Sequence, residues 1–338
     1  MLPLLFTAAC GPPDYQAVLD ESLVDWEFPG ITAVILEGDE QVFSGSAGVS
    51  NALEETPMRA QDRFRLGSLT KPFTAVVIHQ LDQENLIALD DPVSAWVAGV
   101  PRGDEITLRQ LVLHTSGIGD YVDYGRYWDN ADSPWELDEL LELAFIEEKG
   151  YPGERGYYTN AGYILLGLAI EAATGESWES QIQARIIEPL GLADTGWFDQ
   201  GAEPVHGYER YGEVLVDTTL HSHSENSWAA GALVSNAHDV AAFSVALWGG
   251  ELLDAAHVDL WLVPDPTTGS TDWFRTQGLR LDVVDGEVNL GHMGKGVGYR
   301  SDWSTRPDRD VTVVTMHNGS WRRARDLSNR LFDEHRAR

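Results

Sequence analysis

The chain has 338 residues, with 54 Asp and Glu against 23 Lys and Arg, which gives a formal net charge of −31. This balance excludes broad binding to a nucleic-acid backbone or to an anionic membrane surface, because both need clustered cations. Hydrophobic residues make up 43% of the chain, including 12 Trp and 11 Tyr, and such a chain buries a large core rather than staying disordered.

The first residues resemble the end of a bacterial lipoprotein signal, with Cys10 as the lipidated residue. The run MLPLLFTAA is apolar and ends in small residues, and the Gly-Pro-Pro after Cys10 is typical of a tether. No apolar stretch reaches the 18 residues of a membrane-spanning helix. We therefore interpret residues 1–13 as a signal remnant and tether, and expect a protein that is extracytoplasmic, in the periplasm or at the cell surface, and anchored through a lipid on Cys10. A single cysteine excludes an internal disulfide and a metal site of several cysteines.

Strand patterns occur near both ends of the chain, and helical patterns lie between them. Residues 31–48 contain two strand patterns around a Gly38-Asp39 turn, which is a hairpin signal. Further strand patterns, separated by turn residues, occupy 279–284, 297–303 and 311–316. Apolar spacing of three and four predicts helices at 70–81, 108–113, 162–173, 178–190 and 237–247. Helical patterns with a charged face cover 132–149 and 321–335.

This order favours an α+β fold, within the broader α/β group. We expect an antiparallel sheet built from both chain ends, flanked by helices and carrying a mostly helical inserted lobe. Residues 14–66 and 271–338 would form the sheet lobe, and residues 67–270 the helical lobe. The prediction is one catalytic unit with its cleft between the lobes. A monomer is expected, because surface carboxylates oppose association.

Ser68 and Lys71 stand three positions apart at the predicted start of a helix. Residues at this spacing share a helix face, and Pro72 is tolerated only near a helix start. A serine hydroxyl becomes a good nucleophile when a neighbour removes its proton, and a partly desolvated lysine can be that neighbour. The chain has only two other lysines, Lys149 and Lys295. By itself, the short spacing also fits a capping serine beside a solvated lysine.

Two further elements carry chemistry-bearing residues. Tyr158 and Asn160 lie in a predicted loop before the helix at 162–173. A phenol near a lysine can shuttle a proton, and an asparagine amide can hydrogen-bond a lysine and a substrate. His292 and Gly294 lie in a glycine-rich stretch that runs into a predicted strand, where backbone N–H groups can hold a peptide or an oxyanion. Taken singly, each element also fits an ordinary turn.

In this order, Ser-x-x-Lys at 68–71, Tyr-x-Asn at 158–160 and His-x-Gly at 292–294 resemble the serine penicillin-recognising enzymes. The likeness is to the class C β-lactamase-like branch, which includes β-lactamase-related serine hydrolases, D-alanyl-D-alanine carboxypeptidases, D-aminopeptidases and family VIII-type esterases. The stretches His114-Thr115-Ser116-Gly117 and Glu188-Pro189-Leu190-Gly191-Leu192 share it, and it extends over residues 15–335.

The resemblance implies a catalytic role for three residues. Ser68 would be the acylated nucleophile, Lys71 its activating partner, and Tyr158 the general base that later returns the proton to the leaving group. Whether Lys71 or Tyr158 takes the first proton stays open. Asn160 would orient both the substrate and Lys71.

The third element would border the substrate. His292, Gly294 and Lys295 are the implied binding residues, and the backbone N–H groups of Ser68 and Lys295 would form the oxyanion hole, each donor contributing ~3 kcal/mol to the transition state. His292 stands where many relatives have a lysine, which weakens recognition of a substrate carboxylate. The resemblance implies no cofactor and no metal ion.

The predicted function is hydrolysis of an amide or ester bond in a small peptide or ester, through an acyl-enzyme on Ser68. A D-alanyl-D-alanine carboxypeptidase or D-amino-acid peptidase is preferred, because a lipoprotein would lie near peptidoglycan stem peptides. A short-chain carboxylesterase is the next alternative, and β-lactamase activity is expected to be weak. Two alternatives of other classes are a metal hydrolase using His221 and His223, which lacks an H-E-x-x-H motif, and a catalytically silent penicillin-binding-like module.

Overall fold

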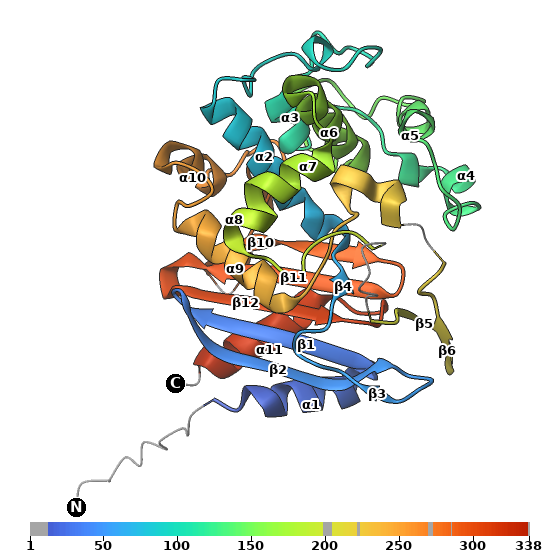
Figure 1. The fold of residues 1–338 in the computed structure, drawn as a ribbon, viewed down its shortest axis with the longest axis vertical. Coiled ribbons are helices and arrows are strands. Elements are labelled where there is room, and N and C mark those ends of the chain that lie inside the picture. The colour runs from blue at the N-terminus through green and yellow to red at the C-terminus, as the bar shows by residue number, and fades with distance from the viewer. Residues whose placement is uncertain (1–12, 199–204, 222–223, 270–272, 285, 337–338) are drawn as a thin grey trace, which may run out of the picture.

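One eight-stranded antiparallel sheet organises the structure, and its strands come from both ends of the chain (Figure 1). The computed structural model describes residues 13–198, 205–221, 224–269, 273–284 and 286–336, so Cys10 lies outside the described residues. The strand order is β3-β2-β1-β12-β11-β10-β9-β8. These strands are β1 (Gly30–Glu37), β2 (Glu40–Asn51), β3 (Thr56–Pro57), β8 (Trp273–Arg275), β9 (Arg280–Val284), β10 (Glu287–Gly296), β11 (Tyr299–Arg306) and β12 (Val311–His317).

The first hairpin joins the last strands through β1 and β12, which pair from Ile31 opposite His317 to Glu37 opposite Val311. The predicted sheet from both chain ends is therefore confirmed. Two small sheets accompany it. They are β4 (Phe64–Arg65) with β7 (Val234–Ser235), and β5 (Tyr208–Tyr211) with β6 (Val214–Asp217).

Helices cover both faces of the large sheet. In Figure 1, α1 (Tyr15–Trp26) and α11 (Ala324–Arg336) lie on its lower side, and the other helices gather above it. The upper α-helices are α2 (Lys71–Gln83), α3 (Leu108–Val112), α4 (Gly125–Trp128), α5 (Leu137–Ala144), α6 (Asn160–Thr174), α7 (Trp178–Ile182), α8 (Glu188–Leu190), α9 (Ala237–Trp248) and α10 (Ala255–Leu262). Short turns of other helix types are η1 (Gly67–Thr70), η2 (Val93–Ala95), η3 (Tyr121–Asp123), η4 (Gln183–Ile187), η5 (Ser224–Ala230) and η6 (Pro307–Arg309).

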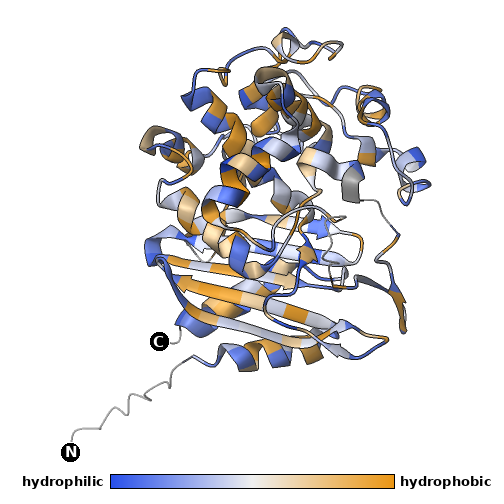
Figure 2. Ribbon diagram, in the orientation of Figure 1, coloured by the Kyte–Doolittle hydropathy of each residue, from blue (hydrophilic) through white to orange (hydrophobic). Residues whose placement is uncertain are grey.

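Side chains of the central strands point alternately to the two faces of the sheet, so the core has two layers, one on each face. Ile31, Ala33 and Ile35 of β1 belong to the cluster packed with α1 and α11, whereas Val34 and Leu36 belong to the larger cluster under the upper helices. Successive strand residues point to opposite faces, and both faces are covered, so β1 is apolar on both sides. Hydrophobic residues accordingly run along the central strands and the helices packed on them (Figure 2).

Several predicted boundaries were wrong. His292, Met293 and Gly294 do not precede a strand, because they lie inside β10, which pairs with β9 and β11. Sheet pairing on both sides outweighs the weak strand preference of the glycines. The next strand begins at Tyr299 rather than at 297. Helix α6 begins at Asn160, so that residue lies in the helix and not in the loop before it.

The acidic segment that ends at Lys149 is helical over a shorter range than predicted. Helix α5 ends at Ala144. Beyond it, the Lys149 N–H donates to the Gly117 carbonyl at 2.7 Å, a tertiary hydrogen bond that draws the backbone out of the helix. The sequence analysis did not predict helices α1 and α10, strand β8 or the β5–β6 hairpin.

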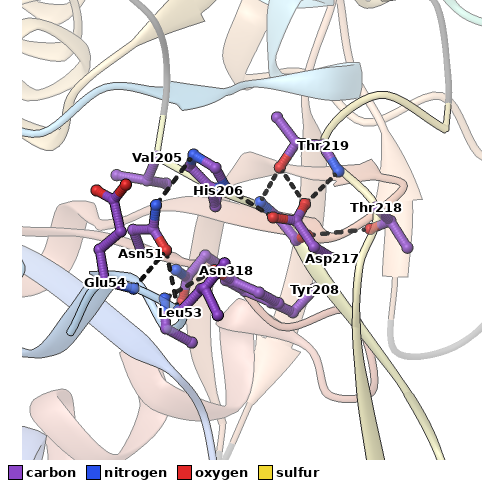
Figure 3. Close-up of polar contacts among 12 residues, drawn as sticks. Asn51, Leu53, Glu54, Val205, His206, Tyr208, Asp217, Thr218, Thr219 and Asn318 are labelled. Atoms are coloured by element: carbon purple, nitrogen blue, oxygen red, sulfur yellow. Dashed lines mark hydrogen bonds and ion pairs between the residues drawn. The ribbon is translucent and has the colours of Figure 1, made fainter. Parts of the chain in front are cut away.

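A polar network fastens the β5–β6 hairpin to the β2–β3 turn (Figure 3). The His206 ring lies between Asp217, 2.6 Å from its Nδ1, and the Asn51 amide, 3.4 Å from its Nε2. The phenol of Tyr208 accepts the Ala52 N–H at 2.8 Å. The base of the hairpin also supports the β10–β11 turn, because the Tyr299 phenol donates to the Val205 carbonyl at 2.7 Å.

Candidate active site

Ser68 and Lys71 lie where η1 passes into α2, immediately beside β10. Gly67 has a φ of +53°, and a Cβ at this position would lie 2.7 Å from the Lys295 carbonyl oxygen. Gly294 is equally constrained, because a Cβ there would lie 1.8 Å from the Leu66 carbonyl oxygen. The two glycines therefore let the backbone before Ser68 pack directly against the strand that carries the third motif.

The Lys71 amine is completely buried and is surrounded by neutral oxygen atoms. Its Nζ lies 3.1 Å from the Ser68 hydroxyl, 2.8 Å from Asn160 Oδ1 and 2.8 Å from the Ala230 carbonyl oxygen. Burial lowers the pKa of Lys71 well below its ordinary value, although the Asp120 carboxylate acts to raise it. The arrangement therefore favours the neutral amine much more than water does.

The three contacts of Lys71 suit an ammonium, which can donate to all three oxygens, and they also suit a neutral amine. Such an amine has two hydrogens and one lone pair. The amide oxygen of Asn160 and the carbonyl of Ala230 can only accept hydrogen bonds, so they take the two hydrogens. The lone pair is then left for the Ser68 hydroxyl.

Asn160 is held by a carboxylate that the sequence analysis did not single out. Asp120 is 2% exposed. Its Oδ2 accepts the Asn160 backbone N–H at 2.8 Å and the Asn160 side-chain Nδ2 at 2.9 Å. Burial raises the pKa of Asp120, against the effect of these hydrogen bonds and of Lys71.

Tyr158 lines the cleft between two aromatic or cationic neighbours. Its ring centroid lies 4.3 Å from that of His114 and 4.6 Å from the Arg275 guanidinium carbon. Burial raises the pKa of the Tyr158 phenol to about 12, although Arg275 and the Ser68 hydroxyl act to lower it. The phenol is therefore protonated in the free protein near neutral pH.

His292 lies on the same cleft and is neutral. It is 5% exposed, and its ring centroid is 6.5 Å from that of Tyr158. Its Nδ1 lies 2.8 Å from the Met293 carbonyl oxygen. A carbonyl only accepts hydrogen bonds, so Nδ1 carries the proton and Nε2 is an acceptor. Burial, together with the charges of Arg275 and Lys71, lowers the pKa of His292 well below its usual value.

The cleft above Ser68 has a volume of about 340 Å³ and is rich in cations. Ser68, Tyr158, His292, Gly294 and Lys295 all line it. The five charged side chains that line it are all basic, namely Arg275, Arg280, Lys295, Arg300 and Arg323. Thus a chain with a net charge of −31 has a positive cleft.

The five cations differ in how far their charge is already satisfied. Arg280 pairs with Asp282 at 2.6 Å, and Arg300 donates to the carbonyls of Gly296 and Tyr299 at 2.8 and 2.7 Å. The other three, Arg275, Lys295 and Arg323, form no ion pair within the part of the chain that the structure describes.

The structure thus brings together all three predicted elements. Sequence reasoning assigned no role to Asp120, His114 or Arg275. The His114-Thr115-Ser116-Gly117 stretch was a usable signal for the first two, because it leads into the loop that supports Tyr158 and Asn160. Arg275 stands in an unremarked three-residue strand, and no local pattern marks it.

Within the described ranges, no three His, Cys, Asp or Glu side chains are grouped so that they could hold a metal ion, and His223 of the metal-hydrolase alternative lies outside those ranges. No helix in the described ranges is long and apolar enough to span a membrane.

The chain is similar to known proteins in sequence and in fold. Penicillin-binding protein 4* of Bacillus subtilis (strain 168) is 26% identical over an alignment of 307 residues, and the match covers 86% of this chain and 62% of that protein. Esterase EstB of Burkholderia gladioli is 31% identical over an alignment of 205 residues, and the match covers 56% of this chain and 52% of the esterase. The crystal structure of a D-stereospecific amidohydrolase from Streptomyces sp. matches with a TM-score of 0.81 and 28% identity, over 93% of this chain and 97% of that one.

The extent of these matches differs between relatives. The chain spans 62% and 52% of the two curated relatives, but nearly all of the solved amidohydrolase chain. The profile of the family described as Beta-lactamase matches residues 16–335, which is almost the whole sequence. This chain therefore belongs to the β-lactamase family.

Proposed function

We propose that the protein is a serine hydrolase that cleaves an amide or ester bond through an acyl-enzyme on Ser68. The observation that carries the proposal is the buried Lys71 amine 3.1 Å from the Ser68 hydroxyl, with its two other contacts made to acceptors. A lysine that is neutral in the folded protein can accept the serine proton, which is the activation that a serine nucleophile needs.

The lowered pKa of Lys71 and the raised pKa of Tyr158 suggest a different proton transfer for each group. Lys71, with its lowered pKa, takes the proton of Ser68 as the Oγ attacks the substrate carbonyl. Tyr158, with a pKa raised to about 12, is a phenol and therefore gives a proton to the leaving amine or alcohol. The phenol recovers its proton from the Lys71 ammonium. Water then hydrolyses the acyl-enzyme by the reverse sequence.

The third motif supplies oxyanion stabilisation in this proposal. The backbone N–H groups of Ser68 and Lys295 would bind the developing negative charge. The close packing of Gly67 against the Lys295 backbone supports this assignment. Each such donor typically contributes about 3 kcal/mol.

We further propose a D-amino-acid peptide or amide as the substrate, with D-alanyl-D-alanine peptides first. The Streptomyces amidohydrolase is D-stereospecific by name, and the Bacillus relative is a penicillin-binding protein. The cleft supports a substrate with a free carboxylate, because Arg275, Lys295 and Arg323 have no ion-pair partner among the described residues.

A short-chain carboxylesterase is the second candidate. It is supported by the 31% identity to the Burkholderia esterase and by the neutral state of His292, which suits an uncharged acyl group. A β-lactamase activity would be weak for the same reason. A catalytically silent module has no use for a buried neutral lysine, so we rank it last.

The test has two parts. First, intact-protein mass spectrometry after exposure to a fluorophosphonate should show one adduct, absent from a Ser68→Ala variant. Second, hydrolysis of a D-Ala-D-Ala peptide, p-nitrophenyl butyrate and nitrocefin should be compared at equal enzyme concentration. A folded wild-type protein that forms no adduct with a fluorophosphonate or a penicillin would overturn the proposed function.

The location and assembly also belong to the proposal. We propose an extracytoplasmic protein anchored through a lipid on Cys10, because the substrates named above occur in the cell wall. Metabolic labelling with an alkynyl fatty acid should mark the wild type and not a Cys10→Ala variant. The protein is expected to be a monomer, which light scattering would check.

A further inference from the structure

Asp120 belongs to a loop that supports the whole Tyr158-Thr159-Asn160 segment from behind. His114 has a left-handed backbone (φ 60°), and its carbonyl accepts the Tyr157 N–H at 2.8 Å. The Thr159 N–H donates to His114 Nδ1 at 3.2 Å, and the Thr159 hydroxyl donates to the Gly119 carbonyl at 2.7 Å. Asp120 ends this loop and contacts Asn160 twice.

These two contacts fix which way the Asn160 amide faces. An ionised carboxylate only accepts hydrogen bonds, so the amide nitrogen must face Asp120 and the amide oxygen must face Lys71. A flipped amide would put its oxygen against the carboxylate and its N–H against the lysine nitrogen. That N–H would then compete with Ser68 for the lone pair that the proposed reaction needs.

We infer that Asp120 is a positioning residue of the active site, which holds the Asn160 amide so that the lone pair of Lys71 stays directed at Ser68 and which provides the counter-charge for the ammonium formed when Lys71 takes the proton. The expected effect of Asp120 on turnover rests on the proposed function. Its expected effect on the pKa of Lys71 does not.

Several charged or titratable groups surround Lys71. They are Asp120 and His114 from the supporting loop, Tyr158 and Tyr163 from the segment and helix that follow, Arg275 from β8, and His292 from β10. Asp120 is the carboxylate in this set. Without it, burial and Arg275 act in the same direction, and the lysine would become a weaker base. A base works best when its pKa lies near the operating pH. The Asp120 carboxylate therefore helps by keeping the pKa of Lys71 from falling too far.

The scarcity of lysine gives a direct measurement. With ¹³C-labelled lysine, the protein should give three Cε resonances, assigned with Lys149→Arg and Lys295→Arg. In Asp120→Asn, the titration midpoint of Lys71 should move to lower pH by about one unit or more, since an opposite charge has been removed. The matched control is Asp123→Asn, three residues along the same loop, where the carboxylate contacts Lys149 and Tyr157 instead. It should leave the Lys71 midpoint unchanged.

Kinetics test the orientation separately. Asp120→Ala removes both hydrogen bonds to Asn160 and should lower kcat by about 10²-fold, the lower end of the range for a disturbed proton transfer. Asp120→Asn keeps an acceptor and should retain more activity than Asp120→Ala, with the acidic limb of kcat/KM displaced to lower pH. The Asp123→Asn variant should stay within twofold of the wild type.

An unchanged Lys71 midpoint in Asp120→Asn would overturn the counter-charge, and equal kcat in wild type, Asp120→Asn and Asp120→Ala would overturn the positioning role. Asp120→Asn serves as the test if Asp120→Ala does not fold. A wild-type protein that hydrolyses none of the three substrates would instead count against the proposed function, and the lysine titration would still decide whether Asp120 acts on Lys71.

Discussion

Two buried cations of this protein are held in opposite ways. Arg325, on α11, donates to Asp302 at 2.5 Å and to Asp282 at 2.6 Å. Lys71, at the start of α2, contacts no carboxylate of the described residues directly and is hydrogen-bonded to a hydroxyl, an amide oxygen and a backbone carbonyl. Burial lowers the pKa of both groups, but the two aspartates outweigh burial at Arg325 and raise its pKa, whereas the pKa of Lys71 falls.

The difference separates a structural cation from a reactive one. A buried charge with ionic partners on two sides stays charged and ties together the elements that carry those partners, in this case α11, β9 and β11. A buried amine among neutral acceptors stays close to neutrality and can change its protonation state. The negative charge nearest Lys71 does not touch it, because the Asn160 side chain lies between Asp120 and Lys71 and is hydrogen-bonded to both.

The largest effect is expected from removing the reactive cation. Lys71→Ala should lower kcat/KM by about 10²- to 10⁴-fold, the range typical of a lost general base. Lys149→Ala is the matched control, because Lys149 contacts Glu147 at 2.8 Å and Asp123 at 3.4 Å on the surface. Its kcat/KM should change by less than twofold. Equal losses in both variants, measured on the same substrate, would contradict the role given to Lys71.

For the stability of the fold, in contrast to activity, the larger loss is expected at Arg325 and the smaller loss at Lys71. Arg325→Met leaves Asp302 buried without its cation and leaves Asp282 with Arg280 alone, and should lower the free energy of unfolding by about 3–5 kcal/mol. Lys71→Met breaks no ion pair but leaves the Asn160 amide oxygen and the Ala230 carbonyl without their donor, and should lower the free energy of unfolding by about 1–3 kcal/mol, the cost of an unsatisfied buried acceptor. Urea unfolding followed by tryptophan fluorescence would measure both. A Lys71→Met variant as unstable as Arg325→Met would show that the two cations are equivalent.

The pH dependence should follow the lowered pKa of Lys71. Below that pKa the amine is protonated and cannot accept the Ser68 proton, so kcat/KM should fall about tenfold for each pH unit on the acidic side. Above it, activity should stay level until Tyr158 loses its proton near its raised pKa of about 12. A pH–rate profile of a neutral ester would check this. An acidic limb centred near the ordinary pKa of lysine would mean that burial does not neutralise Lys71.

The smallest effect is expected at the outer rim of the cleft. Arg323→Ala should raise KM for a peptide with a free carboxylate by about two- to fivefold, the effect of an exposed ion pair of ~0.5–1 kcal/mol. KM for p-nitrophenyl butyrate should not change, and about 1 M salt should remove the difference. The neighbouring Arg322→Ala is the control, because Arg322 pairs with Asp326 at 3.7 Å and does not line the cleft. An equal change for the ester would show that Arg323 does not recognise charge.

Local patterns in the sequence predicted much of this protein. Apolar residues at every second position predicted the first hairpin, and apolar residues three or four positions apart predicted most of the upper helices. Both patterns arise because one face of the element is buried. The spacing of Ser68 and Lys71 is likewise local, since residues three apart share a helix face. The three motifs in order sufficed to indicate the family.

The tertiary structure alone decided the states of the charged groups. Whether Lys71 is neutral depends on burial by segments that are far away in the sequence, including Ala230, Asn160 and, through it, Asp120. The positive cleft depends in the same way on strand β8 and the start of α11 reaching the same space as Ser68. A pKa depends on all the atoms around a group, and those atoms are brought together only by folding.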